Sequence, residues 1–412
     1  MTSNGSLPAE VFVSNGMGVD SIAWLTAVLR GDIPVDFEIP RMVVGSAMTG
    51  DESKRTRWAM ETFALPLMRK NNVRYVQMAR GGWSQEDGVE VLSDSRQTTR
   101  MVMRGKVTLS ESAAAAGTIP QQSNRNCSYA FKGWVLDTWL AAEYGDTERR
   151  HVVGFAAEET GRAARDDGYS RNTPGKVPWY PLIELDWDRD QCLRYLWDVY
   201  GIEWPRSCCG FCPFQAGPDI GRMAARWQAE PEQAATALRL ELPALALNPR
   251  MKLFGQNLSA GDAARRFGLG DVVDQVRAEL AAKPAAIYEI RRVYRRAGDK
   301  RHPSGKGHGW VLGPDAFAKS NDVWRSLRQV WSGGTLAEAQ AELAAMRDTL
   351  GGQIDHEGRL WLKREEGPMY PDTEHYFAIA PAGIADKERE AFAEMWGWVG
   401  GLDLDRQEAL PI

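Results

Sequence analysis

A turn rich in glycine and serine, residues 14–21, combines residue types that bind phosphate. Residues 11–25 read V-F-V-S-N-G-M-G-V-D-S-I-A-W-L, so the turn lies between a short apolar strand and an apolar helical run. The first N–H groups of a helix lack partners within it, its dipole favours an anion, and glycine lets the backbone approach closely. The pattern predicts a phosphate-binding loop, and an ordinary strand–helix turn is the alternative. It differs from the G-x-x-x-x-G-K-[ST] loop, because no lysine follows the glycines.

Asp20 adds a carboxylate to this loop. A carboxylate beside a phosphate can hold Mg²⁺ through water, which suits this hard cation. The alternative is that Asp20 caps the helix. The candidate ligand-binding residues of the loop are Ser14, Gly16, Gly18, Asp20 and Ser21.

The cysteines form the second chemical set. Five occur, at positions 127, 192, 208, 209 and 212. Cys209 and Cys212 have the C-x-x-C spacing that lets two thiolates reach one metal, and Cys127 and Cys192 would complete four ligands for zinc or an iron–sulfur cluster. Cys208 is a fifth candidate. Inert buried thiols are the alternative, above all for Cys192, which lies among leucines.

The elements that position these residues alternate between strand and helix. Strands are expected at 11–13, 41–47, 73–78 and 151–155, with helices between the first three. This alternation predicts an α/β fold with a doubly wound parallel sheet, whose ligands bind beyond the carboxyl ends of the strands. The loop 14–21 and the segment 49–52 should therefore face one crevice.

Two further segments carry basic residues. Residues 93–126 are polar and lack a clear pattern, which predicts a lid over the crevice or a loose insertion. The run 291–301 carries Arg291, Arg292, Arg295 and Arg296 at helical spacings, which predicts either a nucleic-acid contact or a solvated helix face. The lid and the basic run are the candidate contacts for a nucleic-acid acceptor. The five histidines form no H-x-x-x-H pattern and receive no role.

Composition limits the class of protein. The chain has 412 residues, 43% hydrophobic and 25% charged, which is typical of globular domains. The net charge of −5 provides no global attraction for nucleic acid, so a polyanion would need a local basic patch. No apolar run is long enough to span a membrane and the first residues do not resemble a secretory signal, so a cytoplasmic protein without a membrane partner is expected.

Four motifs in order resemble the PP-loop ATP pyrophosphatase superfamily, in its phosphoadenylylsulfate (PAPS) reductase-like branch. The turn S-x-G-x-G-V-D-S is one residue longer than the usual S-G-G-x-D-S. The other three are R-N-C-S-Y-A-F-K at 125–132, Y-P-L-I at 180–183 with W-D-R-D-Q-C-L-R-Y-L at 187–196, and P-R-S-C-C-G-F-C-P-F at 205–214. The family position before C-x-x-C is not normally cysteine, so Cys208 is a departure.

The resemblance assigns further residues to the site. The segment 49–52 is similar to the family's D-T-G-x-E, with methionine for the first aspartate, which implies that Thr49, Gly50 and Glu52 lie beside the nucleotide. Glu52 would bind ribose or help to position Mg²⁺, or else be a solvated helix carboxylate. Gly154 and Arg162 are similar to a strand-end G-x-x-x-x-E-x-x-R. The arginine would grip phosphate and act with Asp20 and Ser21 in catalysis.

Arg125 and Lys132 are similar basic candidates beside the cysteines. The ligand set implied is Cys127, Cys192, Cys209 and Cys212, holding an iron–sulfur cluster, [4Fe-4S], in preference to zinc. Cys208 is the alternative to Cys192.

The function implied is an ATP-dependent adenylating sulfurtransferase. ATP would be cleaved to AMP and pyrophosphate, activating an acceptor oxygen, such as one on nucleic acid, for displacement by sulfur from a donor protein. One alternative is a PAPS or adenylylsulfate reductase, against which stands the absence of any cysteine after 212. Another is a non-catalytic nucleotide- or nucleic-acid-binding module with a structural metal. The expected divisions are 1–215 for the PP-loop and cysteine domain, 216–300 for a helical region, and 301–412 for an α+β region of unknown role.

Overall fold

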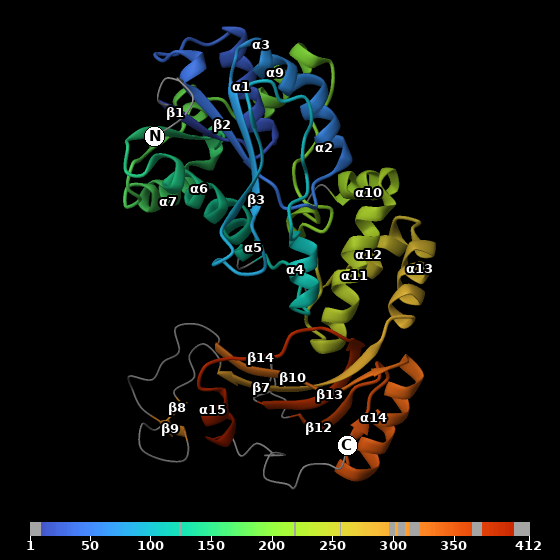
Figure 1. Cartoon of the computed structure of the whole chain (residues 1–412). Helices are drawn as coiled ribbons and strands as arrows, with labels where there is room; N and C mark the ends of the chain where they lie inside the picture. Colours follow the sequence, from blue (N-terminus) through green and yellow to red (C-terminus); the bar gives the residue numbers. More distant parts are fainter. Residues whose placement is uncertain are drawn as a thin grey trace. The chain divides into compact units, whose positions relative to one another are not determined.

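The computed structural model describes residues 10–122, 125–217, 220–255, 257–295, 301–303, 310–312, 322–364 and 373–398. The chain forms two compact units (Figure 1). Unit 1 comprises Met1–Ser112 and Pro120–Thr236, and unit 2 comprises Ala113–Ile119 and Ala237–Ile412. The division differs from the expected boundaries, because the helical region is shared between the two units and joins no third one.

Unit 1 is an α/β structure around a six-stranded sheet of order β4-β3-β2-β1-β5-β6. All neighbouring strands are parallel except β3 and β4. In chain order its elements are β1 (Val11–Ser14), α1 (Val19–Arg30), β2 (Met42–Ala47), α2 (Lys54–Ala59), α3 (Leu65–Lys70), β3 (Arg74–Arg80), β4 (Val89–Ser95), α4 (Leu109–Ala115, which continues into unit 2), α5 (Asn126–Ser128), α6 (Trp134–Tyr144), β5 (Arg149–Val153), α7 (Thr160–Ser170), β6 (Lys176–Trp179), α8 (Pro181–Glu184), α9 (Arg189–Tyr200) and α10 (Ile220–Ala229).

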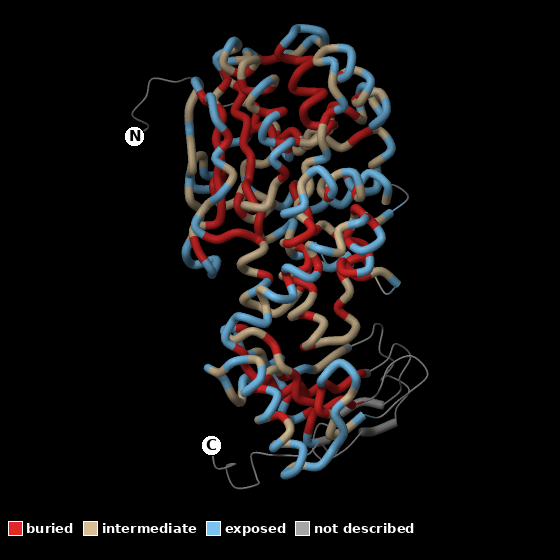
Figure 2. The backbone as a smooth tube through the Cα atoms, turned by 90° about the vertical axis from the view of Figure 1, so that its right-hand side faces the viewer, coloured by how far each residue is buried: buried red, intermediate tan, exposed pale blue. Residues whose placement is uncertain are grey.

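The residues of β1 show why both faces of the sheet in unit 1 are covered by apolar side chains. Val11 and Val13 pack on one face of the sheet with α1 and α9, while Phe12 packs on the other face with Val135 and Trp139 of α6. Successive strand residues point to opposite faces, so a strand covered on both sides reads as an uninterrupted apolar run. Figure 2 shows the resulting buried strands in red. The expectation of an α/β fold is confirmed.

The order in which the chain adds strands to this sheet changes side at β1. The strands β1, β2 and β3 follow one another outward on one side, whereas β5 and β6 lie on the other side of β1. In open α/β sheets such a switch point leaves a crevice at the carboxyl ends of the two central strands. The ends of β1 and β5 are therefore the place to look for a ligand site.

The segment expected to form a lid packs against the body of unit 1. After β4 the Met101 side chain is buried, its N–H donates to Glu61, and the Val102 N–H donates to the Gln77 side chain at 2.8 Å. Residues 113–119 belong to unit 2. Over 93–122 the expected segment is thus held by hydrogen bonds and a buried side chain, whereas residues 123–124 lie outside the described part.

Unit 2 is built on a second six-stranded sheet, of order β11-β12-β13-β7-β10-β14, with antiparallel neighbours. Its elements are α11 (Pro231–Leu247, which begins in unit 1), α12 (Ala260–Arg266), α13 (Gly270–Ala281), β7 (Ala285–Arg295), β8 (Arg301–Pro303), β9 (Trp310–Leu312), β10 (Asp322–Gly334), α14 (Leu336–Leu350), β11 (Gln353–Ile354), β12 (Leu360–Arg364), β13 (Thr373–Pro381), β14 (Lys387–Glu388) and α15 (Phe392–Trp398). The strands β8 and β9 form a separate pair. No helix among the described residues is long and apolar enough to cross a bilayer.

The prediction that the basic run lies on a helix is wrong. Residues 285–295 form the strand β7, which pairs with β10 and β13. Arg291 and Arg292 are both buried, near Glu289 and Glu374 respectively. Buried carboxylates, rather than solvent, therefore surround these two guanidinium groups, and they offer no helical face to a nucleic acid. Residues 296–300 lie outside the described residues.

Candidate functional site

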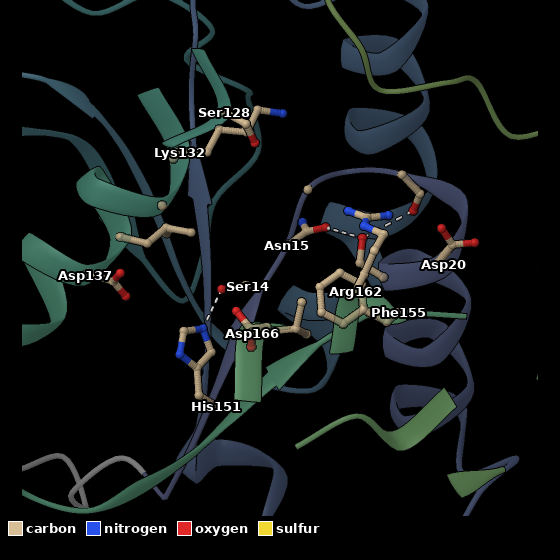
Figure 3. A pocket seen from close by; sticks show the side chains of 18 of the residues that line it. Ser14, Asn15, Asp20, Ser128, Lys132, Asp137, His151, Phe155, Arg162 and Asp166 are labelled. Atoms are coloured by element: carbon tan, nitrogen blue, oxygen red, sulfur yellow. Dashed lines mark hydrogen bonds between the residues drawn. The ribbon is translucent and has the colours of Figure 1, made fainter. Parts of the chain in front are cut away.

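A cavity of about 580 Å³ opens in unit 1 at the carboxyl ends of β1 and β5 (Figure 3). Its lining comes mainly from three parts of the chain, namely the β1–α1 loop, the segment after β5 with α7, and the helical stretch that begins at α5, and Ala47, Lys176 and Ser207 complete it. The predicted residues that line it are Ser14, Gly16, Gly18, Asp20, Ser21, Lys132, Gly154 and Arg162. The loop 14–21 and the strand end at Gly154 thus meet as expected.

Asn15 holds the β1–α1 loop in shape. Its side-chain oxygen accepts hydrogen bonds from the Met17 N–H at 2.9 Å and from the Ser21 hydroxyl at 3.2 Å. Met17 has a φ of 58°, which a side-chain-bearing residue adopts at a cost, and the Asn15 bond helps to fix it. The Asn15 amide nitrogen is buried without a partner among the residues described. Asn15 therefore both shapes the loop and leaves a donor unused at the cavity.

The amino end of α1 meets the requirements for binding an anion. Gly18 is the N-cap residue and provides no side-chain cap, so the first-turn N–H groups are left available. Asp20 lies in the first turn and does not cap the helix. These features agree with a phosphate loop, because a bound phosphate can accept from the free N–H groups.

Gly16 leaves room for a ligand. A Cβ added at Gly16 would meet no protein atom within 4 Å, and Gly16 lines the cavity. A methyl group there would therefore occupy ligand space without disturbing the fold.

We expect Gly16→Ala to weaken ATP binding roughly ten- to a hundredfold, because the added carbon keeps the phosphates from the backbone. Isothermal titration calorimetry would measure this change. Gly161→Ala is the matched control, because Gly161 is an exposed helical glycine outside the cavity lining that likewise has open space around it. Equal affinity in the Gly16 variant and the wild type would show that no phosphate lies against this part of the loop.

Asp20 has one oxygen engaged and one unused. Its Oδ2 accepts from Arg189 at 2.9 Å, whereas its buried Oδ1 has no partner among the described residues. Burial raises the pKa of Asp20, Arg189 opposes the rise, and Glu159 and Glu158 add to it. A buried carboxylate oxygen with this surplus of negative charge fits a cation such as Mg²⁺.

The strand end after β5 approaches the loop closely. A Cβ on Gly154 would lie 2.9 Å from the backbone N and Cα of Ser21, so only glycine fits there. Eight residues further on, the Arg162 guanidinium is ion-paired with Glu159 and lies 4.8 Å from the centre of the Phe155 ring. The predicted strand-end residues therefore border the cavity, with Arg162 already held in position by two neighbours.

His151 is a cavity residue that the sequence did not reveal. Its Nε2 lies 2.6 Å from the Ser14 hydroxyl, as Figure 3 shows. Burial holds the pKa of His151 well below 6.5, and Lys176 and Arg149 act in the same direction. The imidazole is therefore neutral near pH 7 and fixes the orientation of the Ser14 hydroxyl. The only sequence signal is a histidine within a strand that ends in glycine.

Two lysines bring positive charge to the cavity. Lys176 is paired with Asp137 at 3.2 Å. Lys132 forms no ion pair with any described residue, and it lies in the π-helical turn Tyr129–Gly133. Such turns are frequent at functional sites. Lys132 is thus a cation at the cavity that is paired with no carboxylate in the described part of the chain.

The segment 49–52 does not line the cavity. The Glu52 carboxylate accepts from the Thr49 N–H and hydroxyl, both at 2.8 Å, and from the Gly50 N–H at 3.1 Å. The Glu52 carboxylate therefore closes its own turn, and Glu52 is outside the lining of the cavity. The Thr49 hydroxyl lies 3.4 Å from the sulfur of Cys209, which connects this turn to the cysteine segment.

The raised pKa of Asp51, in the same turn, predicts that the stability of the fold depends on pH. Its Oδ2 accepts from the Ser110 N–H at 2.8 Å, and burial raises its pKa from 3.8 to about 6. The folded chain then binds this proton more tightly than the unfolded chain, so stability falls as the pH rises between those two values and stays lower above them.

We expect Asp51→Asn to stabilise the protein by about 1–2 kcal/mol near pH 8 and hardly at all near pH 4, since asparagine keeps the acceptor without the buried charge. Urea unfolding at both pH values measures this. The control is Asp36→Asn, because a hydrogen bond from Arg150 lowers the pKa of Asp36 and its removal should act in the opposite direction. A destabilised Asp51 variant near pH 8 would contradict the assignment.

Arg226 contacts the cysteine segment that follows residue 205 at Cys208. The Arg226 guanidinium donates to the sulfur of Cys208 at 3.0 Å and to the Gln215 side chain at 3.1 Å. A hydrogen bond from the Cys212 thiol, together with Arg226, lowers the pKa of Cys208 to about 5. Burial raises the pKa of Cys209. This segment therefore places the Cys208 sulfur between a guanidinium group and the Cys212 thiol.

The other two cysteines differ in their surroundings. Cys127 lies in α5, and the segment just before this helix reaches the cysteine loop, because Arg125 lies over the Phe214 ring at 4.3 Å. Cys192, in contrast, is fully buried in the apolar core with Leu196, and burial raises its pKa to about 12. The structure thus brings Cys208 to Cys209 and Cys212, and leaves Cys192 in the core.

No three His, Cys, Asp or Glu side chains are arranged to hold a metal ion within the part of the chain that is described. The ligand set Cys127, Cys192, Cys209 and Cys212 therefore stays a prediction, and Cys192 is its member with the poorest fit. Comparison of the chain with protein-family models, with curated proteins and with solved structures finds no match.

Proposed function

We propose that unit 1 is a doubly wound PP-loop domain that cleaves ATP between its α and β phosphates. One observation carries the proposal, namely the cavity at the switch point of the sheet, bordered by the uncapped amino end of α1 and the loop 14–21. Its volume of about 580 Å³ is in the range of nucleotide-sized pockets. No second observation favours a reductase or a non-catalytic module.

In this proposal the loop holds the departing pyrophosphate. The N–H groups of the first turn of α1, that of Ser21 among them, and the hydroxyl of Ser14 donate to phosphate oxygens, and the neutral His151 keeps Ser14 oriented. Lys132 and Arg162 reach the cavity from other elements and offset the charge that develops on the leaving group. Asp20 would hold Mg²⁺, which when bound neutralises phosphate charge.

The proposed reaction is adenylation followed by sulfur transfer. An acceptor oxygen attacks the α phosphorus, the bond to the bridging oxygen breaks, and pyrophosphate leaves with that electron pair. A donor protein then delivers sulfur at the oxidation level of hydrosulfide, which attacks the acceptor atom that bears the activated oxygen. The bond to that oxygen breaks and AMP leaves with the oxygen and the electron pair, without a change of redox state. We propose nucleic acid as the acceptor class on the resemblance alone, since Arg291 and Arg292 of the basic run are buried in unit 2.

An iron–sulfur cluster on the cysteines is part of the same proposal, but the residues present fit it only in part. Cys208, Cys209 and Cys212 lie in one segment, whereas Cys192 is enclosed in the core. We therefore take Cys208 in place of Cys192 as the fourth sulfur and assign no step of the reaction to a cluster.

The test is to purify the protein without oxygen, measure iron, acid-labile sulfide and zinc, and assay pyrophosphate release from ATP with transfer RNA and DNA as acceptors. Stoichiometric iron and sulfide that survive Cys192→Ala but not Cys209→Ala support the cysteine assignment. A zinc protein that binds ATP and releases no pyrophosphate with either acceptor would favour the non-catalytic alternative.

A further inference from the structure

Unit 2 contains a second, small cavity whose lining is basic. It is bordered by residues of β7, β10 and α11, by the inserted segment 113–119 and by Lys387 of β14. The charged side chains in its lining are Arg292, Arg325 and Lys387, and no carboxylate is among them. A cavity whose charged lining residues are all cations attracts an anion.

The insertion of residues 113–119 into unit 2 fixes one wall of this cavity. The Ala385 N–H donates to the Ala115 carbonyl at 2.9 Å, and the Lys387 ammonium donates to the Ala116 carbonyl. Gly117 has a φ of 51°, and a Cβ on it would lie 2.7 Å from Ile384. The wall is therefore a tightly packed structure, and the position of Lys387 is set by the backbone that faces it.

The positive charges at this cavity are not fully balanced. Arg292 is paired with the buried Glu374 at 3.2 Å, and Glu374 also pairs with Arg250. Arg325 and Lys387 form no ion pair with any residue the structure describes. Burial and the nearby Arg325 lower the pKa of Lys387 to about 8. An anion between the two cations would remove this repulsion.

The size of the cavity limits the ligand. Its volume is about 40 Å³, which is room for roughly three waters or one small oxyanion and too little for a nucleoside. Asn248, Thr118 and Ser326 also border it and supply neutral polar groups beside the cations. Guanidinium and ammonium groups together are the usual donors to phosphate oxygens.

We propose that this cavity binds a single phosphate group, held by Arg325 and Lys387 with Arg292 beside them. The site lies wholly within unit 2 and is separate from the ATP cavity of unit 1. The phosphate belongs either to free inorganic phosphate or to a nucleic-acid backbone, because both present the same oxyanion.

Competitive acetylation of lysines in the full chain, read by mass spectrometry, tests this proposal. Lys387 reports the site in unit 2, Lys132 reports the ATP cavity, and the half-exposed Lys283 serves as the internal reference. At a phosphate concentration four times the dissociation constant, we expect Lys387 to be acetylated about fivefold more slowly, and Lys283 at an unchanged rate. Because each cavity has its own reporter, failure of one site is distinguished from failure of the other.

The variant Arg325→Gln should abolish the protection of Lys387 by phosphate. It should leave unchanged the protection of Lys132 by ATP, which is measured in a parallel sample. A second arm uses a single-stranded oligonucleotide in phosphate-free buffer, where protection identifies the nucleic-acid backbone as the source and its absence identifies free phosphate. Acetylation of Lys387 that neither inorganic phosphate nor the oligonucleotide slows would overturn the proposal, as would full protection in the Arg325→Gln variant.

Discussion

Asp20→Asn should lower the rate of pyrophosphate release from ATP by about 10²–10³-fold. The carboxylate has a buried oxygen that no described residue contacts by a hydrogen bond, and Asp20 lines the cavity. Asparagine keeps the shape of the side chain but cannot hold a divalent cation by charge. Because burial raises the pKa of Asp20, the variant should fold at least as stably as the wild type. Steady-state kinetics with a coupled pyrophosphate assay would measure the loss.

The matched control is Asp36→Asn. Asp36 is also paired with an arginine, Arg150 at 2.7 Å, but it is exposed and outside the cavity lining. We expect its activity to be unchanged. If Asp20→Asn retained more than about a tenth of the wild-type rate, Asp20 would not carry the role assigned to it, and the helix-end site would have to act without its carboxylate.

Glu374→Gln should cost unit 2 about 3–5 kcal/mol of stability. Glu374 is 1% exposed and its oxygens accept from Arg250 at 2.6 Å, Arg292 at 3.2 Å and the Tyr294 hydroxyl at 3.0 Å. Removing its charge leaves the buried Arg292 guanidinium without its counter-ion, and that group cannot shed its proton. Burial alone would raise the pKa of Glu374, but the two arginines outweigh it and lower the pKa, so the stabilisation is lost as the pH falls through that lowered pKa.

Urea unfolding followed by tryptophan fluorescence would show the effect as an early transition of unit 2. The control is Glu279→Gln, which breaks the partly exposed pair with Arg239, 2.9 Å long, and should cost no more than about 1 kcal/mol. Equal losses in the two variants would mean that burial of the pair adds nothing, contrary to the structure.

The sequence predicted those parts of the site that lie close together along the chain. The loop 14–21 is recognisable because a strand, glycines and a helix follow one another. Gly154 is recognisable because it directly follows the strand β5. The loop and Gly154 are expected to meet, because parallel strands place their carboxyl ends at one edge of the sheet. Thr49 and Glu52 also follow a strand, but the Glu52 side chain folds back on its own turn, which residue spacing alone does not reveal.

Contacts between distant residues could not be predicted in the same way. The Ser14–His151 pair joins residues 137 positions apart, and each has an ordinary neighbourhood in the sequence. The strand β7 was mistaken for a helix because its arginines interrupt the apolar alternation. Glu289, the partner of Arg291, lies on β7 itself, whereas Glu374, the partner of Arg292, only becomes apparent when β7 and β13 are aligned in the sheet. Charges that are neutralised in the interior look like a solvated surface in the sequence.

The products formed from ATP test the central claim most directly. Purified protein would be incubated with ATP, Mg²⁺ and candidate nucleic-acid acceptors, and the nucleotides and phosphates separated by ion-exchange chromatography. The account predicts AMP and pyrophosphate in equal amounts, and their loss in the Asp20→Asn variant. Formation of ADP and inorganic phosphate, or no detectable binding of ATP at millimolar concentration, would contradict it.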